Sequence, residues 1–138
     1  MGQYSKALFS YEKALKIMQI AHPPNHPDFT NLYENIACMY IHRGEYQEAL
    51  ALFERSLEIR KIALPQNHLD LATSYNNTGF LYDNIGDYLK ALSVYEQSLG
   101  IRKIALPLNH LQLAHSYNNT GDVYSSMGEY AKALSSYE

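Results

Sequence analysis

The sequence is poor in several features that would assign it to particular protein classes. It has one cysteine, Cys38, in 138 residues, so no disulfide can form within the chain and a reducing, cytoplasmic setting is favoured. No apolar run reaches the length of about 18 residues that a membrane-spanning helix needs. The first ten residues lack the order of a secretion signal. With a net charge of −3 and no basic excess, neither a membrane nor a nucleic acid is expected as a partner.

A period of 42 residues runs through the chain. The hexapeptide "SYNNTG" occurs at Ser74–Gly79 and again 42 residues later at Ser116–Gly121. Over their full length, residues 44–85 and 86–127 share 26 identical residues in 42. A fixed interval between about 20 and 50 residues indicates a repeat array, in which each unit buries its apolar face against its neighbours.

Each unit has the pattern of two helices. Apolar or small residues recur every three or four positions between residues 71 and 82, which predicts a first helix with one buried stripe. Asn67 is the predicted N-cap of this helix, and Gly86 is expected to end it with a positive φ. A second helix is predicted from near Asp87 to Arg102 and Lys103, whose charges suit the negative end of the helix dipole.

Small residues in both helices predict close packing within each unit. Gly79 on the first helix and Ala91 on the second would allow the two backbones to approach each other. A glycine inside a helix costs about 1 kcal/mol relative to alanine, and close packing has to offset that cost. Replacing Gly79 with leucine should therefore overpack the crossing by roughly 1–3 kcal/mol.

The segment "YNNTGFLYDNIGDYLKALSVYEQSL" resembles a tetratricopeptide repeat. Tyr75, Gly79 and Tyr82 stand at the positions that this family uses in its first helix, and Tyr88 and Ala91 stand at positions of its second helix. The 42-residue period and the "LP.NH" connector are similar to the repeats of kinesin light chain. The resemblance implies an all-α fold of the α-solenoid type, a right-handed superhelix of antiparallel helix pairs with about seven helices.

The repeat phase predicts how the chain is divided. We expect one tetratricopeptide-repeat array over residues 1–138, with a partial unit at 2–20 and helix pairs at 28–62, 70–104 and 112–138, the last of them truncated. Because the chain starts and stops inside units, we expect it to be a piece of a longer array. Its end helices would then expose apolar residues and favour end-to-end self-association. At the C-terminal end these are Tyr130, Ala133, Leu134 and Tyr137.

Tyrosines and histidines are numerous, but their spacing indicates structure rather than chemistry. All 13 tyrosines fall on four repeating positions, which predicts that they belong to the core. His26, His68 and His110 recur once per unit, and helix packing separates equivalent atoms by about 8–10 Å, too far for shared bonds of about 2.1 Å to one metal ion. Connector turns or helix caps explain them better. The other histidines, His22, His42 and His115, are scattered, and we predict no catalytic residue, metal or cofactor.

Function is expected on the first helices, because in the related proteins these helices line the concave face of the superhelix. Some positions there differ between otherwise similar units, and two asparagine pairs recur among them. A side-chain amide both donates and accepts hydrogen bonds, so it can bind a peptide backbone of any sequence. Two alternatives stay open: neutral drift on a solvated face, and a structural role for Asn77 and Asn119. The predicted peptide-binding groove consists of Thr73, Asn76, Asn77, Phe80, Asp83, His115, Asn118, Asn119 and Asp122.

Charge narrows the expected partner. Ten of the eleven lysines and arginines fall in second helices, whereas the predicted groove contains the acids Glu34, Asp83 and Asp122. An acidic ligand would need cations in the groove. We therefore expect a neutral or basic peptide as the partner, and no acidic peptide.

The resulting prediction is a protein–protein interaction scaffold without catalysis. The alternative is the non-catalytic repeat region of a larger multidomain enzyme, because similar repeats also occur beside catalytic domains such as arginine ADP-ribosyltransferases.

Overall fold

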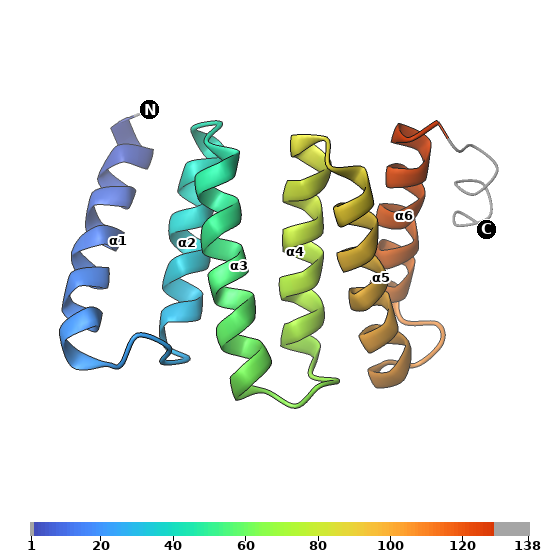
Figure 1. Cartoon of the computed structure of the whole chain (residues 1–138), viewed down its shortest axis with the longest axis horizontal. Coiled ribbons are helices and arrows are strands. Elements are labelled where there is room, and N and C mark those ends of the chain that lie inside the picture. Colours follow the sequence, from blue (N-terminus) through green and yellow to red (C-terminus); the bar gives the residue numbers. More distant parts are fainter. Residues whose placement is uncertain (1, 129–138) are drawn as a thin grey trace. The chain divides into compact units, whose positions relative to one another are not determined.

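The computed structural model describes residues 2–128, which form six α-helices joined by short connectors (Figure 1). No strand occurs within this range, and none of its helices is long and apolar enough to cross a membrane. The all-α prediction is confirmed, while the expected seventh helix, with its apolar end residues, lies outside the described range. The helices are α1 (Gly2–Ala21), α2 (Phe29–His42), α3 (Tyr46–Ala63), α4 (Leu69–Ile85), α5 (Tyr88–Ala105) and α6 (Leu111–Ser126).

The helices belong to two compact units. The first unit, Met1–Ala63, contains α1, α2 and α3, and the second, which begins at Leu64, contains α4, α5 and α6. Within the first unit α2 packs against both α1 and α3, and within the second α5 packs against both α4 and α6. In each unit, consecutive helices therefore bury their faces against each other.

The histidines of the connectors begin the first helices. His68 accepts a hydrogen bond from the Asp70 backbone N–H at 3.0 Å and is the N-cap of α4, and His110 caps α6 in the same way through Gln112 at 3.1 Å. The predicted cap role is confirmed for His68 and His110, whereas α2 has Asp28 as its N-cap and no side-chain cap bond. The prediction of Asn67 as N-cap is wrong by one residue, because the backbone turns into the helix at His68.

The turn between α4 and α5 has the predicted chemistry. Gly86 ends α4 with φ of 93°, a conformation that side-chain-bearing residues adopt only with strain. Asp87 then caps α5, because its side chain accepts a hydrogen bond from the Lys90 backbone N–H at 3.4 Å. Both helix ends therefore follow from local sequence.

The α4–α5 packing depends on a glycine beneath an aromatic ring. A Cβ atom on Gly79 would lie 2.7 Å from Cδ1 and from Cε1 of Tyr95, so the ring occupies the space of the missing side chain. Tyr95 is 3% exposed and packs with Ala91 and Val123, which are fully buried. The predicted close packing at Gly79 is confirmed, with a tyrosine ring as the partner.

The prediction that every tyrosine belongs to the core is too broad. Among the tyrosines between residues 2 and 128, only Tyr95 is buried. Burial, followed by the negative charges of Asp83 and Asp122, raises the pKa of the Tyr95 phenol above its usual value, so this side chain stays neutral. Tyr4 and Tyr117 are 39% and 38% exposed.

Arg102 is buried near the end of α5. The residue is 7% exposed, and burial lowers the pKa of its guanidinium. The Nη1 atom donates to Ser116 Oγ at 2.7 Å and to the Gln112 carbonyl at 3.5 Å, and so links α5 to α6. Nε of the same guanidinium is buried without a hydrogen-bond partner.

Candidate peptide-binding face

The nine residues of the predicted groove all lie in the second unit, on α4 and α6. We call them the candidate face. Phe80 is 51% exposed, and Thr73, His115, Asn118 and Asp122 are exposed as well. The others, Asn76, Asn77, Asp83 and Asn119, are partly buried.

Two of the asparagines join the two helices. Asn119 Nδ2 donates a hydrogen bond to Asn76 Oδ1 at 2.8 Å, between α6 and α4. A structural role, one of the two alternatives for Asn119, is therefore confirmed. The bond uses one group of each amide and leaves the amino group of Asn76 and the carbonyl of Asn119 to other partners. Asn118 is exposed beside this link.

The carboxylates of the face are close enough to influence each other. Burial and then the negative charge of Asp122 raise the pKa of the Asp83 carboxyl. Both charges also act on the phenol of Tyr95 beneath them. Neither α4 nor α6 contains a lysine or arginine. The acidic character predicted for this face is present.

In the first unit, Glu34 stands at the repeat position of Asn76, and its carboxylate pairs with an arginine. Arg60 of α3 binds Glu34 of α2 with two hydrogen bonds, Nη1 to Oε1 at 2.6 Å and Nη2 to Oε2 at 3.3 Å. Ser56 Oγ donates to the same carboxylate at 3.0 Å. The sequence reasoning counted Glu34 among acids without a nearby cation, and this is wrong, because a second-helix arginine reaches it. Asn76 stands at the aligned position in the second unit.

Cys38 lies on α2 at the position that aligns with Phe80, and its side chain is exposed. Burial of the sulfur and the charge of Glu34 both raise the pKa of the thiol. The thiol is therefore protonated at neutral pH, and a protonated thiol is a poor nucleophile. A small surface residue is the better description.

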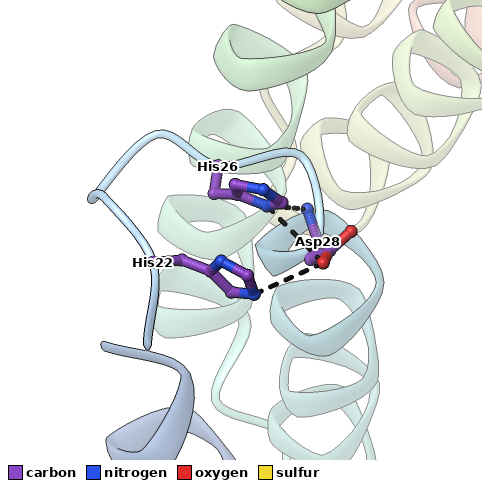
Figure 2. Close-up of side chains that lie close together, drawn as sticks. All are labelled: His22, His26 and Asp28. Atoms are coloured by element: carbon purple, nitrogen blue, oxygen red, sulfur yellow. Dashed lines mark hydrogen bonds and ion pairs between the residues drawn. The ribbon is translucent and has the colours of Figure 1, made fainter. Parts of the chain in front are cut away.

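One cluster escaped the sequence reasoning. In the connector from α1 to α2, His22, His26 and Asp28 point toward one another (Figure 2). The two imidazole rings stack with centroids 3.9 Å apart, so the description of His22 as one of the scattered histidines is wrong. The detectable signal was its repeat position, where the other connectors carry Leu64 and Leu106.

Comparison with known families agrees with the helix-pair geometry. A tetratricopeptide-repeat model matches residues 1–62 and 28–104, and a second one matches residues 114–138. The chain belongs to the tetratricopeptide-repeat family. Repeats of this family generally mediate protein–protein interactions and are typically non-catalytic scaffolds.

Solved structures of helical repeat proteins share the fold of this chain. BtubC (BKLC) from P. vanneervenii matches with a TM-score of 0.87 and 26% identity, over 98% of this chain and 54% of that one. A putative kinesin light chain from Podosopora anserina with nearly identical repeats matches with a TM-score of 0.87 and 23% identity, over 98% and 64%. The tetratricopeptide-repeat domain of Arabidopsis FLU has the same fold at 17% identity, with a TM-score of 0.69 over 80% and 89%. No curated protein sequence matches the chain.

Proposed function

We propose that the candidate face binds an extended peptide segment of neutral or basic charge, and that the chain acts as a cytoplasmic, non-catalytic scaffold. The observation that carries this proposal is the pair Asp83 and Asp122 on adjacent first helices. Asp122 opposes the ionisation of Asp83, so the face favours a cationic group of a ligand over an anionic one.

The chemistry of the neighbouring side chains specifies the ligand further. Phe80 lies three residues before Asp83 and four after Asn76, so the three share one side of α4. An apolar ligand residue would contact the exposed ring of Phe80 while a neighbouring lysine or arginine reaches the carboxylates. The amides of Asn76 and Asn118 would bind the peptide backbone, which requires no particular sequence. The proposed ligand therefore has a basic residue next to an apolar one.

The test is fluorescence anisotropy with three peptides of equal length, which are basic–apolar, neutral–apolar and acidic–apolar. We expect the basic peptide to bind most tightly and to weaken between about 50 and 300 mM salt, because exposed charges are screened. A charge-assisted hydrogen bond contributes about 1.5–3 kcal/mol. The variant Asp83→Asn with Asp122→Asn should therefore lose roughly tenfold or more in affinity for the basic peptide alone.

Matched variants distinguish binding by the candidate face from a general effect of the protein's net charge. Glu96→Gln removes one negative charge from an exposed position on α5 and should leave affinity unchanged. Asn118→Ala removes an exposed amide and should weaken all three peptides equally. Asn119→Ala breaks the link to Asn76 and reports on the geometry of the face. Tight binding of the acidic peptide, or unchanged binding by the doubly neutralised variant, would refute the proposal.

A specific observation favours a second interaction, self-association through α1. Phe9, Ile17 and Ile20 are 60%, 67% and 90% exposed on this helix, and we propose that a second copy covers them. Light scattering should show a mass that rises with protein concentration. Ile17→Lys combined with Ile20→Lys should hold the chain at the monomer mass, and a wild-type chain that stays monomeric at millimolar concentration contradicts the idea.

The alternative that the chain is the non-catalytic repeat region of a larger enzyme stays a prediction.

A further inference from the structure

The connector between α1 and α2 gathers two imidazoles and a carboxylate (Figure 2). His22 Nε2 lies 3.4 Å from Asp28 Oδ2, and His26 Nδ1 lies 3.6 Å from the same oxygen. All three donor atoms fall within 4.8 Å of one another. When zinc binds nitrogen and oxygen ligands at about 2.0–2.1 Å, tetrahedral geometry places neighbouring donors about 3.4 Å apart. Two of the three separations are therefore close to those of a metal site.

We propose that His22, His26 and Asp28 bind a divalent transition-metal ion of the zinc, nickel or copper type. Neutral imidazoles with one carboxylate suit these ions, whereas calcium and magnesium prefer a shell of oxygens. The repeat spacing predicts no metal site, because that argument considers only the equivalent histidines of different units, which lie too far apart to share an ion. Here both histidines come from a single connector.

Contacts around the cluster hold the connector in place. Arg55 of α3 donates to the Pro24 carbonyl at 3.4 Å and to Asn25 Oδ1 at 3.2 Å, between the two histidines. The His22 ring also meets Phe29 edge-on, with centroids 6.4 Å apart. The positive charge of Arg55 opposes a cation, so direct bonds from the three donors have to provide the affinity. The restrained backbone lowers the entropy that binding would otherwise cost.

The site is open to solvent and needs a small rearrangement. The His22 and His26 side chains are 32% and 33% exposed and that of Asp28 is 63% exposed, so an ion can enter and water can complete its shell. The rings stack at 18°, and they have to rotate before both lone pairs point at one ion. His26 Nδ1 also accepts a hydrogen bond from the Asp28 N–H at 3.1 Å. Coordination through this atom exchanges that bond for a metal bond.

The other connectors provide internal comparisons. His68 and Asp70 repeat the second half of the cluster, with Nδ1 3.8 Å from Oδ2, but the residue four positions earlier is Leu64 instead of histidine. In the third connector the aligned residues are Leu106, His110 and Gln112. Only the first connector supplies three donors. An ion there would join the end of α1 to the start of α2, independently of the peptide-binding proposal, which concerns α4 and α6.

The experiment is titration of the full chain with Zn²⁺ by calorimetry, together with NMR of the histidine side chains during addition of Cu²⁺. We expect one zinc ion per chain. Paramagnetic broadening should appear first at His22 and His26 and later, if at all, at His68 and His110. The Asp28 amide signal should shift as its hydrogen bond is lost, while the Asp70 amide signal stays in place.

Three variants make the result decisive, each checked for helix content by circular dichroism. His22→Leu introduces the residue of the other connectors and should lower zinc affinity at least tenfold. Leu64→His completes a second set with His68 and Asp70 and should raise the stoichiometry to two. Leu106→His, which gains no carboxylate, should give weaker added binding than Leu64→His. Unchanged affinity in His22→Leu, absence of zinc binding at millimolar concentration, or broadening centred elsewhere would overturn the proposal.

Discussion

Gly79→Ala should destabilise the second unit, although the same change usually stabilises a helix. Alanine gains about 1 kcal/mol over glycine inside a helix. At Gly79, however, the new Cβ would lie 2.7 Å from two ring atoms of Tyr95, and this ring is almost fully buried. Overpacking of this kind costs about 1–3 kcal/mol. We therefore expect a net loss of up to about 2 kcal/mol in the free energy of unfolding.

A double-mutant cycle isolates the clash. Tyr95→Val removes all three of the ring atoms that the new Cβ would meet, namely Cδ1, Cε1 and Cζ. In that background Gly79→Ala should stabilise the protein by up to about 1 kcal/mol, as helix propensity dictates. The sign of the effect should reverse, with a coupling energy of about 1–3 kcal/mol between the two positions.

Urea denaturation followed by circular dichroism measures all four proteins of the cycle. Gly100→Ala on α5 is the matched control, because the added Cβ would meet no neighbour within 4 Å beyond the adjacent backbone of its own helix, and it should stabilise by about 1 kcal/mol. If Gly79→Ala raises the unfolding midpoint as much as Gly100→Ala does, the Tyr95 ring moves aside without cost, and close packing at Gly79 does not limit stability.

Three further predictions concern single side chains. Ser116→Ala should cost about 1–3 kcal/mol in urea denaturation, because it removes the shorter of the two hydrogen bonds of the buried Arg102 Nη1. A stability equal to wild type would contradict that. Asp83→Asn should raise the melting temperature at pH 7, because the pKa of the Asp83 carboxyl is raised in the folded state and its ionisation therefore disfavours folding. The gain should vanish as the pH falls to the ordinary carboxyl pKa of 3.8. A gain in melting temperature that does not depend on pH would refute this cause. His68→Ala should lower stability by about 1 kcal/mol through loss of the α4 cap, and His68→Asn, which restores an acceptor, should recover most of it.

The candidate face shows how far a single sequence can be interpreted. Helical spacing correctly placed its residues on two first helices and indicated its acidic character. The hydrogen bond between Asn76 and Asn119 could not be derived, because residues 43 positions apart meet only after both helices have packed. Peptide binding by this face stays a proposal.

The sequence alone determines the helical class and the glycine that ends α4, because these depend on residues a few positions apart. It also determines the repeat length, because the same residues recur every 42 positions. The partner of a long side chain depends instead on which helix it meets after packing. Arg60 and Arg102 occupy the same repeat position, yet Arg60 binds Glu34, 26 residues earlier, and Arg102 binds Ser116, 14 residues later. Asn76 stands at the position of that glutamate in the second unit, so Arg102 has no aligned carboxylate to bind. Periodicity specifies positions along each helix, but contacts distant in the sequence set the charge pairs, and with them the chemistry of each surface.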